Sequence, residues 1–120
     1  MPAPISMSDL LNKKCVPCEG GVLPFDISEI HKYQKKVDGW EIIKNQDKIF
    51  LLEKNFKFKN FLESQRFINE VGKISEEEGH HPDIFFGWGY AKINITTHAI
   101  EGLSENDFIL ASKIDRLINA

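Results

Sequence analysis

Residues 76–107 read EEEGHHPDIFFGWGYAKINITTHAIEGLSEND, and this stretch decides how the chain is predicted to fold. Gly79 favours the left-handed turn that ends many helices, and Pro82 prevents the helix from continuing. Apolar and polar residues then alternate, as they do in a strand with one buried face. Ser104 and Asp107 have capping-box spacing, which indicates a helix start. The stretch therefore predicts the end of one helix, a hairpin and the beginning of another helix.

The flanking segments predict the remaining elements. Apolar residues that recur at helical spacing indicate helices, whereas β-rich runs separated by turn residues indicate hairpins. The expected elements are helices at 27–37, at 60–78 and from 104 onward, and hairpins with strands at 40–44 and 48–57, and at 83–88 and 91–98. We therefore expect an α+β fold, in which three helices cover one face of a four-stranded antiparallel sheet. We further expect residues 1–25 to form a leader before a single domain at 26–120.

Length, charge and hydropathy limit the functional classes. A chain of 120 residues suits one domain, and its 42% hydrophobic and 28% charged residues are typical of a soluble protein. The net charge of -3 argues against a direct nucleic-acid ligand, because phosphate binding usually needs a basic face. Lys54, Lys57 and Lys59 lie near Glu53, and we interpret them as a solvated strand end. No secretory or membrane-spanning run is visible, so we expect a cytoplasmic protein with no membrane partner.

The leader contains both cysteines, in the sequence Cys15-Val-Pro-Cys18. A C-x-x-C motif supports redox chemistry when it follows a strand and opens a helix, and no strand is predicted before this one. Two cysteines also supply only half of a four-ligand zinc site. We interpret the motif as a loop feature; a disulfide, or half of a metal site shared with another group, is the alternative.

Three of the four histidines, His80, His81 and His98, lie at the ends of predicted elements. Histidine titrates near neutral pH, so such a cluster is typical of a proton-transfer site. The Glu76-Glu-Glu run places three carboxylates at a helix C-terminus, where the macrodipole disfavours negative charge. These side chains are either a solvated acidic end or carboxylates that serve the histidines. In the second case Glu76, four residues before His80, is the best candidate.

Two further residues allow both a structural and a functional interpretation. Trp40 opens the first hairpin, where an aromatic side chain either packs in the core or stacks on a flat ligand. Asp107 lies near a helix start, where the macrodipole favours a carboxylate. From the pattern alone, the structural interpretation is favoured for both.

The order Glu76, His80-His81-Pro82, Trp88, His98 and Asp107, with its gaps, is more specific than any single residue. This spacing closely resembles the signature of the pterin-4a-carbinolamine dehydratase family. Further matches are found at Gly39-Trp40, Phe56-x-Phe58-x-x-Phe61, Gly102-Leu103-Ser104 and Leu110-Ala111. The resemblance covers about residues 40–115 and leaves the leader outside it.

The resemblance implies dehydration of 4a-hydroxytetrahydrobiopterin, the pterin-4a-carbinolamine, to quinonoid dihydropterin, a step of tetrahydrobiopterin recycling. Hydroxide leaves C4a as water and N5 loses a proton, so a general acid and a general base are needed. The resemblance also implies that no cofactor or metal is required, because the pterin is itself the substrate. The expected assembly is a homodimer or homotetramer.

By the same resemblance, His80, His81 and His98 carry the proton transfers. The implied substrate-binding residues are Glu76, Gly79, Pro82, Thr96, Thr97 and Trp40. Among these, Glu76 orients or binds the substrate, and Trp40 flanks the pocket.

Two alternatives come from other classes of protein. Three histidines can hold zinc and leave a position open for water, although the adjacent His80 and His81 converge poorly on one ion. The other alternative is a non-catalytic role, because mammalian relatives of the family also act as a dimerisation partner for a homeodomain transcription factor. An exposed hairpin edge, or the broad apolar arc of the helix at 60–78, would support oligomerisation.

Overall fold

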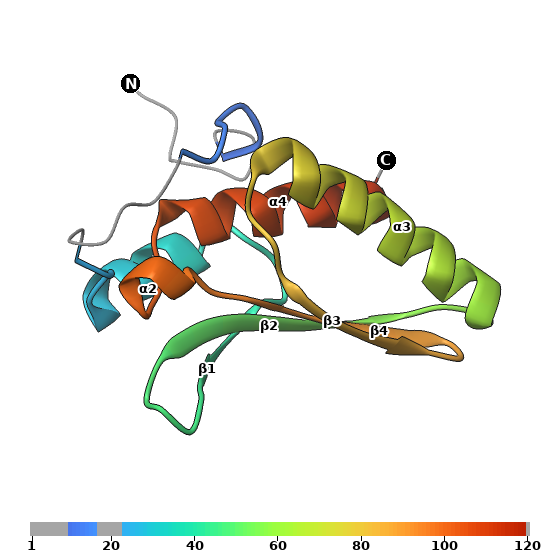
Figure 1. Ribbon diagram of the computed structural model, residues 1–120, viewed down its shortest axis with the longest axis horizontal. Coiled ribbons are helices and arrows are strands. Elements are labelled where there is room, and N and C mark those ends of the chain that lie inside the picture. Colours follow the sequence, from blue (N-terminus) through green and yellow to red (C-terminus); the bar gives the residue numbers. More distant parts are fainter. Residues whose placement is uncertain (1–9, 17–22, 120) are drawn as a thin grey trace.

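The computed structural model describes residues 10–16 and 23–119, and it shows three helices packed against one sheet (Figure 1). In chain order the elements are α2 (Ile27–Gln34), β1 (Glu41–Lys44), β2 (Phe50–Lys57), α3 (Phe61–Glu78), β3 (Asp83–Gly87), β4 (Tyr90–Ile95), the 3-10 helix η1 (His98–Ile100) and α4 (Glu105–Asn119). This order matches the predicted alternation of helices and hairpins. No helix within the described ranges is both long and apolar enough to cross a membrane.

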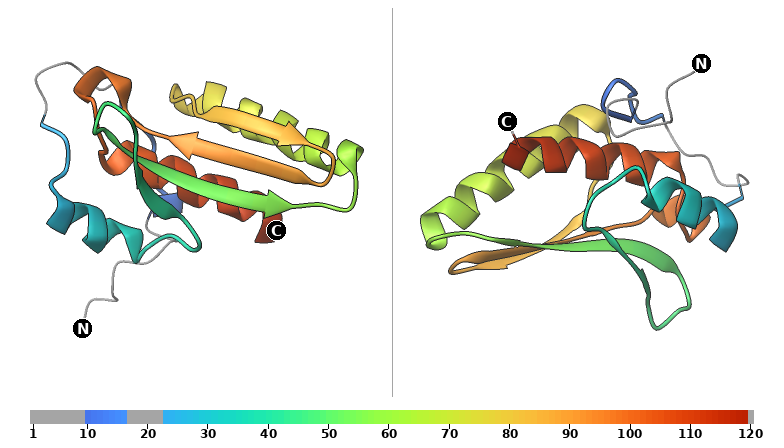
Figure 2. Two further views of the ribbon diagram at one scale, coloured as in Figure 1. Left: turned by 90° about the horizontal axis from the view of Figure 1, so that it is seen from below. Right: turned by 180° about the vertical axis from the view of Figure 1, so that it is seen from behind.

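The four strands form one antiparallel sheet in the order β1-β2-β4-β3. In the central pair, Leu52 of β2 lies opposite Ile95 of β4, and Phe56 lies opposite Ala91. Two views of the molecule show α2, α3 and α4 on the same side of this sheet (Figures 1 and 2). The predicted α+β fold is therefore confirmed.

The core fills the space between the sheet and the two long helices. Its fully buried side chains come from β2, β4, α3 and α4, and they include Leu52, Ile93, Ile95, Val71, Phe108, Leu110 and Ile114. Burying one such side chain stabilises the fold by about 1.5–3 kcal/mol relative to leaving it exposed. The buried stripe predicted for the last helix ends early, because Ile118 is 48% exposed.

Local signals define both ends of α3. The Asn60 side chain accepts a hydrogen bond from the backbone N–H of Glu63 at 2.9 Å and so caps the first turn. At the other end Gly79 has φ of 65°, and its N–H bonds back to the carbonyl of Glu76. A side chain with a Cβ is disfavoured there by about 1–2 kcal/mol. The predicted end of this helix is confirmed, whereas α2 stops at Gln34 and not at residue 37.

The first hairpin turns on Asn45, whose side chain accepts backbone hydrogen bonds from Asp47 at 2.8 Å and Ile49 at 3.0 Å. Lys54, interpreted from the sequence as part of a solvated strand end, is instead directed toward α4. Its Nζ lies 2.8 Å from the carboxylate of Asp115, and its side chain is 19% exposed. That interpretation was wrong because Lys54 shares the helix-covered face of the strand.

The second hairpin ends earlier than predicted, and this places His98 outside the strand. The hydroxyl of Thr96 donates to the carbonyl of Phe50 at 2.9 Å, and Thr97 and Gly102 form an isolated bridge. The intervening loop therefore closes on itself as η1, which His98 begins. The expectation that the strand runs from 91 to 98 is corrected by these tertiary hydrogen bonds, since β4 ends at Ile95.

Part of the leader is packed onto the domain. Leu10 and Cys15 are 1% and 7% exposed and belong to the main hydrophobic core. The Cys15 thiol is free. Cys18 lies outside the described residues, so a pairing within the C-x-x-C motif stays untested.

Candidate active site

One cavity of about 250 Å³ brings three histidines together from two distant segments of the chain. It is lined by Val16, Gly79, His80, His81, Thr96, Thr97, His98, Ala99 and Asn106. One wall is the turn after α3, and another is the segment that joins β4 to η1. The sequence therefore identified a group of side chains that the fold gathers around a common space.

His80 is held by a buried carboxylate. Its Nε2 lies 2.8 Å from Oδ1 of Asp107, and the two side chains are 13% and 0% exposed. The other oxygen of Asp107 accepts hydrogen bonds from the Thr97 hydroxyl at 2.7 Å and the Ser104 backbone N–H at 2.8 Å. Asp107 thus caps α4 through one oxygen and orients a histidine through the other. Since a carboxylate occupies Nε2, the Nδ1 position of His80 is the one left for other partners.

His81 is held by a second carboxylate, in an exposed pair. Its Nε2 hydrogen-bonds to Oε2 of Glu76, one helical turn back on α3. The two side chains are 60% and 78% exposed, so the pair adds little to stability. Its effect is to fix the direction of the imidazole ring. Glu76 is thus both solvated and paired with a histidine, and its partner is His81, whereas the sequence spacing had indicated His80.

His98 lines the cavity from the other segment, which joins β4 to η1. It is exposed at the start of η1, and among the described residues no ring hydrogen bond holds it. Beside it, Thr97 is buried against Asp107, while the hydroxyl of Thr96 is used by the carbonyls of Phe50 and Gly102. Both threonines line the cavity, but their hydroxyls are directed into the protein framework.

Of the remaining predicted site residues, Gly79 and Pro82 lie at or next to the cavity, whereas Trp40 lies in the core. Gly79 lines the cavity, and Pro82 follows the histidine pair without being among the lining residues. Trp40 is 2% exposed, and its Nε1 donates to both oxygens of Asp115 at 3.0 and 3.1 Å. The expectation that Trp40 flanks the pocket is therefore not met, because its ring packs against Phe56 in the core.

Sequence reasoning missed four residues at this site, of which Ala99 is simply the neighbour of His98. Asp107 was part of the motif but was interpreted only as a helix-start charge. Asn106 and Val16 line the cavity without having been considered. Asn106 sits beside Asp107 at the predicted helix start, which was the available signal, whereas nothing local connects Val16 to residues 90 positions away.

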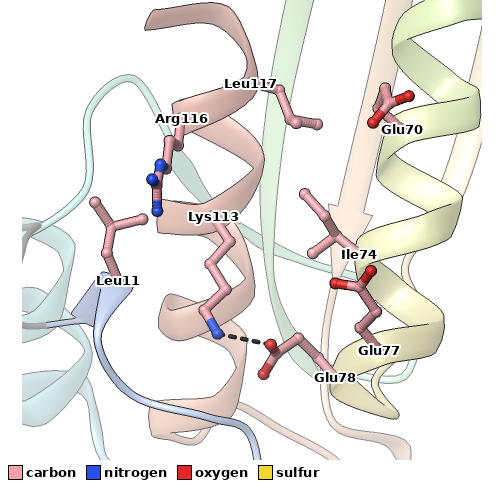
Figure 3. Close-up of a pocket in the computed structure, with 8 residues that line it drawn as sticks. All are labelled: Leu11, Glu70, Ile74, Glu77, Glu78, Lys113, Arg116 and Leu117. Atoms are coloured by element: carbon pink, nitrogen blue, oxygen red, sulfur yellow. Dashed lines mark hydrogen bonds and ion pairs between the residues drawn. The ribbon is translucent and has the colours of Figure 1, made fainter. Parts of the chain in front are cut away.

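A larger cavity of about 560 Å³ lies elsewhere, between α3 and α4 (Figure 3). Its lining includes Glu70, Glu77, Arg116 and the ion pair of Lys113 with Glu78, and it contains no histidine. Size therefore does not identify the site; the three gathered histidines do. In the described ranges no group of three or more His, Cys, Asp or Glu side chains has the geometry to hold a metal ion.

Comparisons with known proteins agree with this geometry. A family model described as "Pterin 4 alpha carbinolamine dehydratase" matches residues 24–117. A protein of Rubrobacter xylanophilus named "Putative pterin-4-alpha-carbinolamine dehydratase" is 47% identical over 111 residues, which are 92% of this chain and 100% of that protein. A protein of the same name from Halorhodospira halophila is 46% identical over 108 residues, or 90% of this chain and 96% of that one.

Two solved structures share the fold. One is titled as a transcriptional coactivator/pterin dehydratase from Brucella melitensis; it has a TM-score of 0.71 at 24% identity, over 78% of this chain and 97% of that one. The other is titled as a pterin dehydratase-like protein that is a RuBisCO assembly factor in the alpha-carboxysome. It has a TM-score of 0.58 at 25% identity, over 68% of this chain and 92% of that one. From the family match, the close relatives and the fold together, the chain belongs to the pterin-4-alpha-carbinolamine dehydratase family.

Proposed function

We propose that this protein dehydrates 4a-hydroxytetrahydrobiopterin to quinonoid dihydropterin and water, by general acid–base catalysis in the histidine cavity. The observation that carries the proposal is the convergence of His80, His81 and His98 on one cavity, with two of them oriented by carboxylates. Membership of the dehydratase family supplies the substrate class. The reaction serves the recycling of tetrahydrobiopterin after it has been used in hydroxylation.

The chemistry requires two proton transfers. The bond from C4a to oxygen breaks, and a general acid supplies the proton with which hydroxide leaves as water. A general base takes the proton from N5, and the electron pair of that N–H bond forms the C4a–N5 double bond. No oxidation state of the protein changes, and each well-placed proton transfer contributes about 10²–10⁴-fold to the rate.

The three histidines are suited to these steps in different ways. His80 and His81 each have Nε2 engaged by a carboxylate, which orients the ring and leaves Nδ1 for the substrate. His98 lines the same cavity from a different segment of the chain and is the third proton-transfer group of this proposal. Metal independence and the absence of a cofactor are part of this proposal and stay predictions, as does the homodimer or homotetramer.

The test is turnover of chemically generated 4a-hydroxytetrahydrobiopterin by purified variants. His81→Ala and His98→Ala should each lower kcat by about 10²-fold or more, because each removes a proton-transfer group from an exposed position. His80→Ala should cost less, since its neighbour partly replaces it, and the double change of His80 and His81 should cost more. The thermal unfolding midpoint of each variant, measured in parallel, separates loss of catalysis from loss of folding.

His31→Ala is the matched control. His31 is exposed on α2, where its ring contacts Gln34 at 3.3 Å, and it lies outside the cavity. Its replacement should leave kcat unchanged within about twofold. If His81→Ala and His98→Ala both kept full turnover at unchanged stability, the catalytic assignment would be wrong, and a binding role for the His80-His81-Pro82 turn would replace it. Titles of the two solved structures, which name a coactivator and an assembly factor, indicate the kind of role to test next.

A further inference from the structure

The leader segment 10–16, here called the strap, lies across the ends of the two helices that carry the His80–Asp107 pair. Lys14 Nζ donates to the carbonyl of Glu77, at the C-terminal end of α3, at 3.1 Å. Lys13 forms an ion pair at 2.7 Å with Glu105, at the beginning of α4. Both contacts are made by exposed lysines of the strap, so each contributes little to stability. They nevertheless show that the strap spans from one helix end to the other.

The side chain of Glu78 holds the strap in place, and a strap held in this way is here called seated. One carboxylate oxygen accepts the backbone N–H of Cys15 at 2.9 Å, and the other accepts Lys113 Nζ at 2.6 Å (Figure 3). Burial alone would raise the pKa of Glu78, but the hydrogen bonds from Lys113 and from Cys15 N–H hold this pKa below its ordinary value. The carboxylate is therefore ionised at neutral pH, and it joins the strap, α3 and α4 at one point.

Beyond Cys15, the strap is held by Asn106 in a two-hydrogen-bond pair. The backbone N–H of Val16 donates to Oδ1 of Asn106 at 3.1 Å, and Nδ2 of Asn106 donates to the carbonyl of Val16 at 2.7 Å. Asn106 is 6% exposed, so both of its polar atoms would be unsatisfied without the strap. This pair holds Val16 at the edge of the histidine cavity, of which Val16 and Asn106 are both lining residues.

The strap supplies a wall that the catalytic segments do not. The other lining residues come from the turn after α3, Gly79 to His81, and from residues 96–99. Val16 lies outside the part of the chain that the family model matches, which begins at residue 24. The strap is therefore an addition to the catalytic segments, although the relative from Rubrobacter xylanophilus aligns over 92% of this chain.

We propose that the strap is a wall of the reduced-pterin site, with Asn106 as the positioning residue that holds Val16 against the bound ring. This inference rests on the proposed function for the identity of the ligand. Val16 supplies an apolar surface for the pterin at the edge of the cavity. Because the strap transfers no proton, its displacement weakens substrate binding and leaves the chemical step intact, so KM rises while kcat is retained.

Cys15 provides a direct readout of whether the strap is seated. Burial, followed by the neighbouring Glu78 carboxylate, raises the pKa of the Cys15 thiol from 9.0 to about 12. Three pKa units correspond to about 10³-fold less thiolate at a given pH, and the thiolate is the form that alkylating reagents attack. In a Cys18→Ser background, slow alkylation of Cys15 therefore reports a seated strap, and fast alkylation reports a released one.

The test compares Asn106→Ala with Asn69→Ala in that background. Asn69 is exposed on α3, away from the strap, and is the matched control. Asn106→Ala should speed alkylation of Cys15 by at least about tenfold, raise KM about five- to tenfold, and change kcat by less than about twofold. Val16→Gly should give the same rise in KM, and because Val16 is 66% exposed this change does not threaten folding.

Binding of 7,8-dihydrobiopterin, measured by calorimetry, separates this inference from the proposed function. If the parent protein binds this pterin without turning over the carbinolamine, the proposed function fails, while a five- to tenfold weaker binding by Asn106→Ala still supports the strap as a wall. The inference is overturned if Asn106→Ala leaves alkylation of Cys15 at the parent rate. It is also overturned if alkylation accelerates while KM and pterin affinity stay unchanged, or if the parent binds no reduced pterin.

Discussion

Two buried carboxylates on α4, Asp107 and Asp115, lie about two helical turns apart and have different roles. They are 0% and 1% exposed, and each accepts a nitrogen donor from a distant segment. Asp115 pairs with Lys54 and Trp40 within the core, and neither partner is a proposed catalytic residue. Asp107 pairs with a histidine that borders a cavity. Burial of an acid is thus common to both, and the two differ in that the partner of Asp107 borders the histidine cavity.

The electrostatics of the core pair differ accordingly. Burial raises the pKa of Asp115, and the hydrogen bonds from Lys54 and Trp40 offset only part of that effect. An ion pair of this kind holds a strand and a helix in register while contributing little net stability, because desolvation opposes the attraction. Removing one partner is a different matter, since it leaves a charge in the core without compensation.

The largest expected effect follows from that asymmetry. Asp115→Ala should lower the free energy of unfolding by about 3 kcal/mol or more, because Lys54 loses its counter-ion and Trp40 its acceptor. Urea denaturation measures the loss, and turnover per folded molecule should stay within about twofold. Asp47→Ala, in the exposed turn of the first hairpin, should change stability by less than about 0.5 kcal/mol. An equal loss of unfolding free energy in Asp115→Ala and Asp47→Ala would show that the buried ion pair of Asp115 is no more important to stability than an exposed turn residue.

Asp107→Asn should affect catalysis instead. The amide can still accept from Thr97 and Ser104 through its oxygen, so its nitrogen then faces His80 as a donor. This forces the Nε2 of His80 to accept and places the ring proton on Nδ1, the opposite tautomer, which should lower kcat about tenfold or more and alter its pH profile. Stability should fall by less than about 1–2 kcal/mol. An unchanged kcat with an unchanged pH profile would reduce Asp107 to a helix cap.

The smallest effects concern the pH dependence of stability, where Glu78 and Asp115 should act in opposite directions. The pKa of Glu78 in the folded protein lies below 4.5, so its stabilisation is present above that pH and is lost as the pH falls through the lowered pKa. The pKa of Asp115 lies above 3.8, so its contribution declines as the pH rises through the raised pKa.

With Glu78→Gln, the free energy of unfolding should therefore fall less as the pH is lowered. With Asp115→Asn, the free energy of unfolding should no longer decline as the pH rises above 3.8. Denaturant midpoints measured from about pH 3 to pH 6 give both slopes. Changes of the same sign in the two variants would contradict the environments assigned to these carboxylates.

The features that the sequence predicted correctly have local signals. The end of α3 follows from Gly79 and Pro82, the first hairpin from the turn residues around Asn45, and the histidine group from spacing within one continuous stretch. The failures involve partners far apart in the chain. Trp40 meets Asp115 across 75 residues, and Lys54 meets it across 61, so no local pattern could indicate this shared partner.

His98 shows a different limit of sequence reasoning. The run Ile95-Thr-Thr-His98 has strand propensity, yet the chain leaves the sheet after Ile95. The hydroxyl of Thr96 binds Phe50 and Gly102, and these tertiary contacts override the local preference. Val16 was missed for the same reason as Lys54, because its partner Asn106 is 90 residues away.

Because of the bridge between Thr97 and Gly102, sequence changes that affect the candidate site are distinct from those that affect the fold. It closes the segment 98–101 into a loop whose ends are fixed by backbone hydrogen bonds at 2.9 and 3.4 Å. Within this loop His98 and Ala99 are exposed, whereas Ile100 is 8% exposed, so exchange of the two exposed side chains should leave the register of β4 and the start of α4 unchanged. A substitution at position 98 should therefore leave the folding of the domain intact, so that this fold can gain or lose a reactive side chain there by a single mutation.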